Sequence, residues 1–569
     1  MTPIDYPNEL RDIALLGKPG AWRRRFLLRP LRAGRYSLLA WPSELLELRA
    51  LQRHDLVFRD GAGPPQAVEL QVPRPLRPFR RWSWRLVRWP SAWHPPRPAP
   101  GAAAQAGDDG EARPDAARGL PLEPAPPSSA LLFEEQPVIH GTFSTADDHG
   151  DEPHRVVMWS CHQPYATDEG GRAVLHADFP GLLEWVRARV EAFAPHVVWG
   201  LGDTAYADGT PATNFVDQAY GEVDLKGRPG QRAELRRAYR RMMRAHWSFE
   251  PLQRVMCSVP HLCVWDDHEI RDGWGSEDED FAGGNPLIYE VAREVADEYV
   301  LSNGPRLRPT RSGQPPRERP DAHQAYIAGS VAAFVFDGRT SRRYADPGGR
   351  ILSEQQFADF EAFCDQVAAA RDVRFLVMGC AVPFINLKDF VEELGAKAPK
   401  ALTDLMAGIR DDIRDSWHAP GNREGLKRLI GILRRLHRRR PHIDIVNVSG
   451  DIHVANAFSF QPPGFFKALY QFTSSALTNR EHPPAAVAAL VDLGSATFTE
   501  VLGLVTRIWD SLGDPNLMTI EARGEVLRVT LQVFDLALPP AERAASPSPK
   551  DLVFDVGSET FGVRRLLRA

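Results

Sequence analysis

Residues 196–206 read HVVWGLGDTAY, and this stretch indicates the fold more clearly than any other. The segment His196–Leu201 is mostly apolar and has the length and composition of a buried strand. It runs directly into Gly202 and Asp203, where the glycine allows the backbone to turn sharply. Ligands of open α/β sheets bind beyond the carboxyl ends of the strands. The stretch therefore predicts a strand that presents the Asp203 carboxylate at a ligand-binding edge.

Polar side chains follow three further predicted strands in the same way. Turns favour Asp and Gly, so a single cluster of this kind would be unremarkable. Four clusters rich in Asp, His, Cys or Tyr predict that four strand ends converge on one site. The other three clusters are Trp159-Ser160-Cys161-His162, Asp266-Asp267-His268-Glu269 and Gly450-Asp451-Ile452-His453.

Strands and helices alternate through most of the chain, which predicts an α/β fold. Helical stretches are expected at Leu182–Phe193 and Glu234–Arg254, from the spacing of their apolar residues. Because helices separate the strands, we expect a parallel or mixed sheet that is covered on both faces. The remaining strands expected in this part are Val156–Trp159, His261–Trp265, Val331–Phe336, Phe375–Met378, Ile443–Val448, Leu517–Ile520 and Val526–Val533.

Composition divides the chain into three parts. Residues 1–95 are expected to form a small, mostly-β module with short strands at Ser37–Trp41, Leu56–Arg59 and Val68–Val72. Residues 96–130 are rich in Pro, Ala and Gly. Such a segment buries too little apolar surface to offset the entropy lost on ordering, so a flexible linker is expected there. Residues 131–569 are expected to form the enzyme domain, including its C-terminal strands.

Overall composition excludes some classes of protein. The 569 residues are 43% hydrophobic and 25% charged, as in ordinary globular proteins. The formal net charge of -5 argues against a nucleic-acid partner, which would favour a basic surface. The basic run from Arg434 to Arg440 is expected to be the polar end of a helix.

The sequence favours a cytoplasmic protein without a membrane span. The five cysteines are widely spaced and odd in number, so they indicate no disulfide framework and suit a reducing compartment. There is no uncharged apolar run of about 18 residues, the minimum for a membrane span. The segment Arg23–Leu27 resembles a twin-arginine export motif, but Arg29, Arg32 and Arg35 interrupt the apolar stretch that such a signal needs.

The side chains at the four strand ends suit a pair of metal ions. Hydrolysis of a phosphate ester gains from a metal that activates water and neutralises developing charge. Two metals about 3.5–4 Å apart need a bridging carboxylate and ligands from several strands. Aspartate oxygens suit Mg, Mn or Ca, whereas His, Tyr and Cys ligands shift the preference toward transition metals, iron included.

In this order, the motifs resemble those of the PhoD-like (alkaline phosphatase D) branch of the calcineurin-like metallophosphatases, over about residues 155 to 480. That branch opens with Ser-Cys, as in Ser160-Cys161, where the wider superfamily has Asp-x-His. This chain has Asp267 where the wider superfamily has Asn. The Gly-His motif that supplies a further metal histidine in the wider superfamily is absent between His268 and Asp451. The resemblance implies a β-sandwich flanked by helices. The other matching motifs are Gly202-Asp203-Thr204-Ala205-Tyr206, Trp265-Asp266-Asp267-His268-Glu269, Asp337-Gly338-Arg339 and Gly450-Asp451-Ile452-His453, with softer matches at Leu352–Gln356 and Asp415–Trp417.

The resemblance also implies a role for each motif residue. Asp203 is expected to bridge two metal ions, which would be Fe and/or Ca, Mn or Mg. His268 is expected beside the phosphate as the general acid for the leaving group. Arg339 is expected either to clamp a phosphate oxygen or to pair structurally with Asp337. The expected metal ligands are Cys161, Tyr206 and His453 at one ion, Asp267 and Asp451 at the other, and Asp203 at both, with the division of Asp451 and His453 left open.

Neighbouring residues have structural interpretations. Asp266 is expected to be a supporting or capping carboxylate, and Glu269 to cap a backbone or to pair with an arginine. His162 and His261 are not expected to be ligands. Two polar runs are expected to be solvated loops: Asp147-Asp148-His149, whose Asp-x-His spelling precedes the first strand of the enzyme domain, and the acidic run Glu277–Asp280.

These observations predict a hydrolase that cleaves phosphate mono- or diesters of small molecules through a dinuclear metal site and metal-activated water. The alternative is a catalytically inert protein of the same fold that binds a phosphorylated ligand or partner. It is less favoured because no expected ligand position carries an apolar residue. A nuclease is disfavoured by the net charge and the acidic run. The oligomeric state is not indicated.

Overall fold

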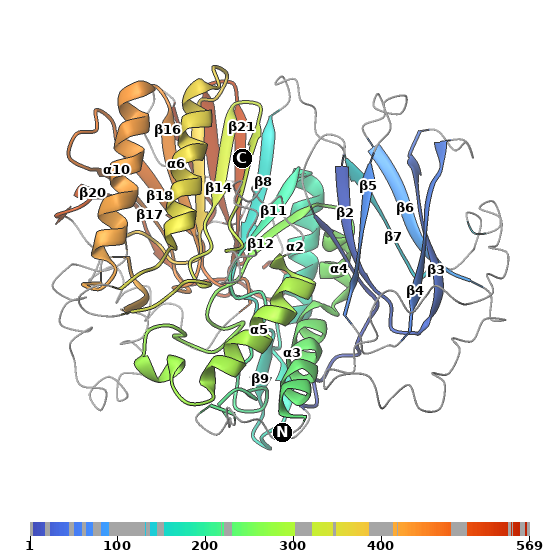
Figure 1. The fold of residues 1–569 in the computed structure, drawn as a ribbon. Helices are drawn as coiled ribbons and strands as arrows, with labels where there is room; N and C mark the ends of the chain where they lie inside the picture. The colour runs from blue at the N-terminus through green and yellow to red at the C-terminus, as the bar shows by residue number, and fades with distance from the viewer. Residues whose placement is uncertain are drawn as a thin grey trace, which may run out of the picture.

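The fold is known from a computed structural model (Figure 1). It describes residues 4–17, 23–44, 50–59, 64–71, 81–89, 131, 137–144, 153–217, 219–220, 230–301, 321–344, 349–385, 414–417, 419–478, 498–543, 548, 550–557 and 564–565. The expected linker at 96–130 and the run Asp147–His149 lie outside these residues.

A seven-stranded mixed sheet forms one half of the enzyme domain. Its order is β12-β11-β8-β21-β22-β23-β24. The strands β8, β11 and β12 run parallel, and β21 pairs antiparallel with β8. The parallel strands therefore end at the same edge of the sheet. Their bounds are β8 His154–Trp159, β11 Val197–Leu201, β12 His261–Val264, β21 Asn516–Arg523, β22 Val526–Val533, β23 Leu552–Val556 and β24 Arg564–Arg565.

An eight-stranded mixed sheet forms the other half, in the order β13-β14-β15-β16-β18-β17-β20-β19. The run β14-β15-β16-β18 is parallel. A shared apolar core, which includes Met158 and Trp199 of the first sheet and Val377 and Val446 of the second, packs the two sheets face to face. The bounds are β13 Gln324–Ala328, β14 Val331–Val335, β15 Phe375–Cys380, β16 Asp444–Ser449, β17 Ala455–Gln461, β18 Leu469–Thr473, β19 Phe498–Thr499 and β20 Gly503–Leu512.

Helices cover the outer faces of the sandwich. One layer packs on the seven-stranded sheet and comprises α2 (Phe179–Phe193), α3 (Gln231–Trp247), α4 (Glu250–Met256) and α5 (Asn285–Tyr299). The other packs on the eight-stranded sheet and comprises α6 (Glu354–Ala369) and α10 (Arg423–Arg439). The sandwich flanked by helices is thus confirmed, and each sheet has helices on one face and the other sheet on the opposite face.

The helix expected at Glu234–Arg254 is wrong as a single helix. It is interrupted at Ser248 and Phe249, where α3 ends and α4 begins. Pro251 lies in the first turn of α4, where its missing N–H costs no helical hydrogen bond. The apolar periodicity continues across the break because both helices pack on the same sheet.

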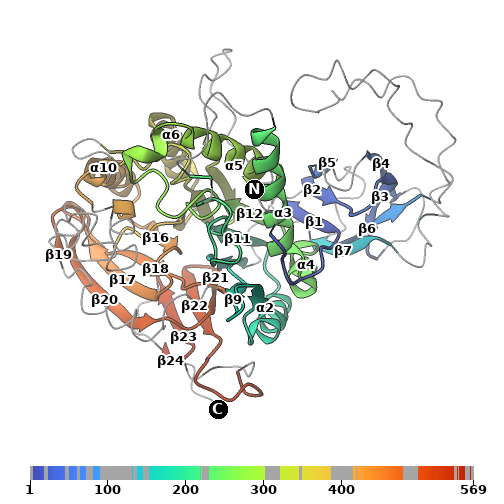
Figure 2. The same ribbon diagram turned by 90° about the horizontal axis from the view of Figure 1, so that it is seen from below.

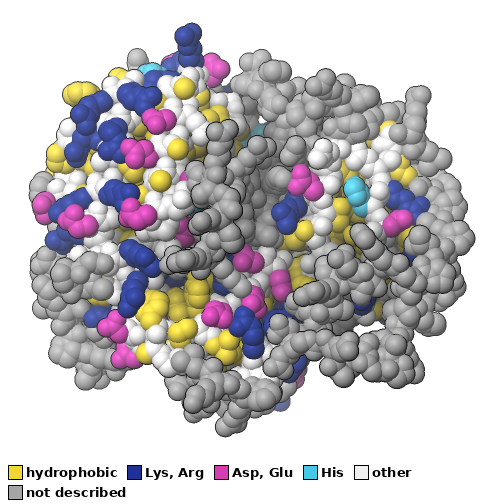
Figure 3. Space-filling view, in the orientation of Figure 1, with side chains coloured by type: hydrophobic (Ala, Val, Ile, Leu, Met, Phe, Trp, Pro, Cys, Tyr) yellow, Lys and Arg dark blue, Asp and Glu magenta, His cyan; other side chains and the backbone are white. Residues whose placement is uncertain are grey.

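The basic run at the end of α10 is bound to α6. Arg435 and Arg439 form ion pairs with Glu361 and Asp365 of α6. Arg440 donates to the carbonyls of Ala368 and Ala370 at the C-terminus of α6. Acidic and basic side chains therefore alternate over this face of the molecule, at the left of Figure 3. The run is the polar end of a helix, as expected.

The N-terminal module consists of two small antiparallel sheets that share an apolar core. The segment with the twin-arginine spelling lies in β2, where Phe26 and Leu28 are buried. The final strand, β7, belongs to this module although the sequence placed it in the enzyme domain, because it pairs with β6. The two sheets are β1 Ile13–Gly17, β2 Arg23–Arg29 and β5 Gln66–Gln71, and β3 Gly34–Pro42, β4 Gln52–Phe58, β6 Arg81–Arg88 and β7 Ile139–Ser144.

The module packs against the helical layer of the enzyme domain, beside α3 and α4 (Figures 1 and 2). The side chain of Asn8 donates to the carbonyl of Ala245, and the indole N–H of Trp84 donates to the carbonyl of Cys257. In the described part of the chain, no helix is long and apolar enough to cross a membrane. A short two-stranded ribbon, β9 Tyr165–Thr167 and β10 Ala173–Leu175, and the 3-10 helix η5 Asp278–Phe281 complete the described elements.

Candidate metal centre

Left-handed turns follow the strands that carry the expected ligands. Only five non-glycine residues in the described part of the chain have positive φ. Four of them are expected ligands, Cys161 at 56°, Asp203 at 54°, Asp451 at 71° and His453 at 54°. This conformation is unfavourable for a residue with a Cβ and persists where surrounding structure imposes it, often at functional sites. The backbone is thus bent at the points where the side chains must face a common centre.

The glycines of the two Gly-Asp pairs, Gly202 and Gly450, are required for different reasons. Gly202 has a φ of 88°, and a Cβ there would lie 2.7 Å from the Cβ of Asp266. Gly450 needs no left-handed φ, but a Cβ there would collide with the side chain of Ser160. The expectation of a sharp glycine turn therefore holds for Gly202, whereas Gly450 serves the close approach of two strand ends.

The structure brings all six expected metal ligands together. The Sγ of Cys161 lies 3.5 Å from Oδ2 of Asp203 and 3.7 Å from the carbonyl oxygen of Asp451. The hydroxyl of Tyr206 lies 3.3 Å from Nε2 of His453. Ligand atoms within 4.8 Å of one another form three overlapping groups, all of which contain Asp203: Cys161 with His453, Asp267 with His268, and Asp266 with Asp267 and Asp451.

The charge of this cluster fits metal ions. Oδ1 of Asp203 and Oδ1 of Asp267 are buried and accept no hydrogen bond. Burial, and then the Asp203 carboxylate, raises the pKa of the Cys161 thiol well above its ordinary value. Burial and the carboxylates around it likewise raise the pKa of Asp451. Buried acids at this density need nearby positive charge in order to ionise, and cations bound by these oxygen, sulfur and nitrogen donors supply it.

His268 lies beside these ligands and is held by a carboxylate. Its Nδ1 is 2.9 Å from Oδ1 of Asp208, and its ring stacks on Tyr206 with centroids 4.2 Å apart. Burial alone lowers the pKa of His268, but Asp208, Asp267 and Asp203 together raise it well above its ordinary value. These carboxylates therefore favour the protonated imidazole at the edge of the cluster.

Arg339 is not placed to clamp a phosphate. It is fully buried, and its Nε donates to Asp266 at 2.7 Å, its Nη1 to the carbonyl of Trp274 at 2.7 Å and its Nη2 to Asp415 at 2.6 Å. The alternative expectation, a structural ion pair with Asp337, is right about the kind of role but wrong about the partner. The guanidinium pairs with Asp266 and Asp415. The one bond from Arg339 to the Asp337 carboxylate comes from the backbone N–H of Arg339, not from its guanidinium. The guanidinium donors are taken up by protein acceptors, so the phosphate role is withdrawn.

Glu269 caps backbone N–H groups, which was one of the two roles expected for it. Its carboxylate accepts the N–H groups of Asp203, Thr204 and Asp266. It thus ties the turn after β11 to the turn after β12. Asp266 supports the site through Arg339, and it also belongs to one of the possible ligand groups.

The acidic run Glu277–Asp280 is only partly solvated, contrary to expectation. Asp280 is fully buried and binds Tyr220 and Arg271, and Glu277 pairs with Arg414. The run forms η5 because its carboxylates cap neighbouring N–H groups. This arrangement neutralises much of its charge locally.

Sequence reasoning missed two residues that act on the centre. Asp208 lies two positions after Tyr206, which ends the Gly-Asp-x-x-Tyr motif, and this closeness to the motif was an available signal. Asp415 belongs to a segment noted only as a soft match, and its link to Arg339 crosses 76 residues. Neither His162 nor His261 belongs to a possible ligand group within the described residues.

Comparison with known proteins agrees with this geometry. No curated protein matches the chain. Among solved structures, the chain is similar to that of PhoD, with a TM-score of 0.60, 13% identity, and coverage of 99% of this chain and 94% of the other. A purple acid phosphatase, PPD1 of yellow lupin (Lupinus luteus) seeds, has a TM-score of 0.48 and 11% identity, with coverage of 97% and 75%. The first similarity supports the shared fold.

The family itself is shown by the sequence match. The chain matches the family of PhoD-like phosphatases over residues 160–499, which is more than half of its length. The match includes every residue of the candidate centre, from Cys161 to His453. This protein belongs to the PhoD-like phosphatase family and is a metal-dependent hydrolase of phosphate esters.

Proposed function

We propose that this phosphatase hydrolyses mono- or diesters of small molecules at a dinuclear centre held by Cys161, Asp203, Tyr206, Asp267, Asp451 and His453. The convergence of these side chains from four separate strand ends supports the proposal most directly. The bound metals would activate water and neutralise charge at the phosphoryl group. The chain's own residues hold the metals and orient the leaving group.

The donor set favours two unlike metal positions. Cys161, Tyr206 and His453 offer sulfur, phenolic oxygen and nitrogen, which suit a transition metal such as iron. Asp267 and Asp451 offer carboxylate oxygens, which suit Ca, Mn or Mg. Asp203 belongs to all the possible ligand groups and is the natural bridge.

His268 is proposed as the general acid. Asp208 holds its Nδ1, which leaves Nε2 free to face the ester oxygen that departs. The negative charge of Asp208 keeps the proton on the ring until the leaving group takes it. A developing alkoxide is a much stronger base than imidazole, so transfer from Nε2 at that moment is favourable.

Metal analysis combined with activity tests this function. Purified protein is expected to carry about two metal ions per chain and to hydrolyse an aryl phosphate, with loss of both after chelation. Asp203→Asn is expected to lose metal and at least about 100-fold in kcat. The matched control is Asp278→Asn, at an exposed residue of η5, which is expected to behave like wild type.

A panel of substrates distinguishes the finer possibilities. Monoesters, diesters and oligonucleotides are compared at fixed salt, and we expect the small esters to be preferred because the net charge is -5. Tight binding of a phosphorylated ligand without turnover of any ester would favour the inert alternative. We also infer a reducing, cytoplasmic location, which the five free, buried cysteines support.

A further inference from the structure

We propose that two histidines that are not ligands, His162 and His246, position the metal ligands Cys161 and Tyr206 by joining the two turns that carry them. The inference rests on the metal centre proposed above and extends it to residues outside the family motifs. The two turns follow different strands, β8 and β11, and each bends where side chains must meet. A direct tether between them would fix the spacing of their ligands.

His246 binds the Tyr206 turn. Its Nε2 accepts the backbone N–H of Tyr206 at 3.3 Å, and its Nδ1 lies 3.0 Å from the carbonyl of Met242, one turn earlier in α3. These partners assign the proton to Nδ1, so the ring is neutral with a single tautomer. Burial and the proximity of His162 lower the pKa of His246 to about 3, in keeping with this neutral form.

His162 completes the connection from the other side. It follows Cys161 directly, its Nε2 lies 2.9 Å from the backbone carbonyl of His246, and its Nδ1 lies 3.2 Å from the hydroxyl of Thr478. The carbonyl must accept, so Nε2 donates and Nδ1 accepts from Thr478. Burial lowers the pKa of His162 to about 4. Two neutral imidazoles with opposite tautomers therefore link Thr478, the Cys161 turn, the end of α3 and the Tyr206 turn.

Surrounding aromatic rings hold His246 in one orientation. Tyr165 packs edge-on against it with ring centroids 5.0 Å apart, and Tyr6 of the N-terminal segment packs at 6.2 Å. Asn8 connects Tyr165 to the end of α3, because its side chain accepts from the hydroxyl of Tyr165 and donates to the carbonyl of Ala245. The first residues of the described chain thus secure the end of α3 that carries the tether.

Such a tether matters because the ligands are held in unfavourable backbone conformations. Cys161 has a φ of 56°, and the N–H of His162 donates to the carbonyl of Asp203, which is also left-handed. Without bound metal the carboxylates of the cluster repel one another, and the hydrogen bonds of surrounding residues help to oppose relaxation of the turns. Hydrogen bonds that orient ligands in this way typically contribute about ten- to hundred-fold to metal affinity.

The test uses the full-length protein with its resident metals. Substitution His246→Asn keeps a donor near Nδ1 but cannot reach Tyr206, whereas His246→Gln can place an acceptor near Nε2. Metal content after timed exposure to EDTA is measured by mass spectrometry, and the melting temperature of each metal-free protein is measured in parallel. We expect about ten- to hundred-fold faster metal loss in His246→Asn and nearly wild-type retention in His246→Gln.

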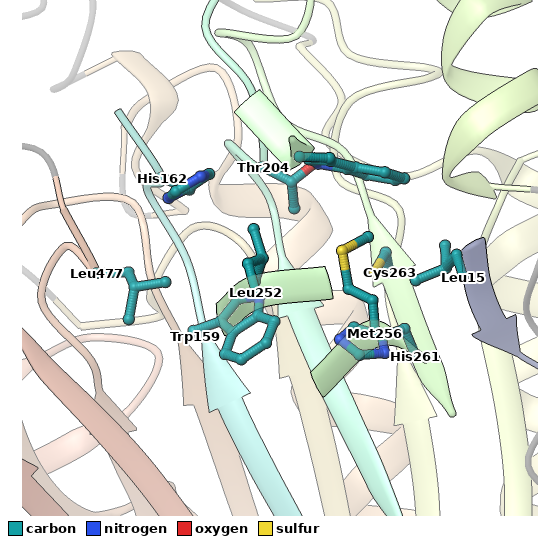
Figure 4. Close-up of a pocket in the computed structure, with 10 residues that line it drawn as sticks. Leu15, Trp159, His162, Thr204, Leu252, Met256, His261, Cys263 and Leu477 are labelled. Carbon is teal, nitrogen blue, oxygen red and sulfur yellow. The ribbon is translucent and has the colours of Figure 1, made fainter. Parts of the chain in front are cut away.

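His261→Asn is the matched control. His261 is equally buried, its Nδ1 lies 2.8 Å from the carbonyl of Val259, and burial lowers its pKa to about 4. It lines a small, mostly apolar cavity together with His162 (Figure 4), but it binds neither ligand turn. His261→Asn is expected to lower the melting temperature about as much as His246→Asn does, but to leave metal retention unchanged.

The outcomes separate this inference from the proposed centre. Wild-type protein that holds no metal would reject the centre itself. Metal retention in His246→Asn equal to that in His261→Asn, or equal loss in His246→Gln and His246→Asn, would overturn the positioning role. If His246→Asn does not fold, the pair His162→Asn and His162→Gln applies the same comparison to the bond that ends on the His246 carbonyl, with the same two results deciding.

Discussion

Replacing Arg339 by methionine gives the sharpest test of how the centre is built. Methionine has a similar length and keeps the apolar contacts of the side chain, but it removes all the hydrogen bonds of the guanidinium. Two interpretations then predict opposite results. If Arg339 clamps the substrate, the substitution weakens phosphate binding. If Arg339 holds buried carboxylates in place, the substitution lowers the stability of the folded protein.

The expected cost follows from the partners of Arg339. Its guanidinium lies 2.6 Å from both Asp266 and Asp415 and 3.4 Å from Asp267, and all of these groups are buried. Without Arg339, Arg342, 2.8 Å from Asp415, and His268 beside Asp267 still oppose part of this negative charge. Removing one partner of a buried ion pair costs about 3–5 kcal/mol. The melting temperature is therefore expected to fall by roughly 5–15 °C.

The assay compares thermal unfolding with steady-state kinetics on an aryl phosphate. Arg435→Met is the matched control, because Arg435 forms an ion pair with Glu361 in which both side chains are about half exposed. Such a pair contributes at most about 1 kcal/mol. Arg339→Met/Asp415→Asn should recover part of the lost stability, since it removes one of the stranded carboxylates.

An unchanged melting temperature in Arg339→Met, together with a raised KM for the aryl phosphate, would refute this reasoning. That result would restore the phosphate clamp that the sequence suggested. A fall in stability with no recovery in the double variant would instead show that Asp415 is not the partner that matters.

Three further predictions follow from the centre. Asp208→Asn should shift the alkaline limb of the pH–kcat profile to lower pH, because Asp208 raises the pKa of His268; an unchanged limb would contradict this. Gly450→Ala should lower the free energy of unfolding by about 1–3 kcal/mol and reduce the metal content, because the added methyl collides with Ser160. Its control, Gly431→Ala, adds a methyl into open space in α10 and should not lower the melting temperature. Burial raises the pKa of Asp266 from 3.8 to about 7, so its ionisation destabilises the metal-free fold as pH rises through that window. Added metal should therefore raise the melting temperature more at pH 7.5 than at pH 5. An equal rise at both pH values would count against the site.

Local sequence was sufficient to predict where the ligands lie. Strands such as Val197–Leu201 are continuous apolar runs, and the polar residues after them stand out against that background. Because β8, β11 and β12 are parallel, their carboxyl ends meet at one edge, and Cys161, Asp203 and Asp267 come together. That inference needs only the strand pattern and the rule that parallel strands end together.

The same reasoning could not assign roles that depend on three-dimensional neighbours. Arg339 occupies a motif position beside a ligand-bearing edge, so a phosphate contact was a reasonable expectation from sequence. Its role was decided by Asp415, which approaches from a distant segment. His246 carries no motif at all, and its value comes from the place where α3 ends against the Tyr206 turn.

By itself, the sequence determined the α/β class and the set of polar residues at the edge where the strands end, from periodicity and from motifs that are local in the chain. The resemblance of those motifs to a known family implied the sandwich flanked by helices. Only the tertiary structure decided which carboxylates converge on the candidate centre, which of them pair with Arg339, and which histidines contact the turns that carry the expected ligands. The physical reason is that burial and charge pairing depend on side chains separated by tens to hundreds of residues, and no local pattern records their approach.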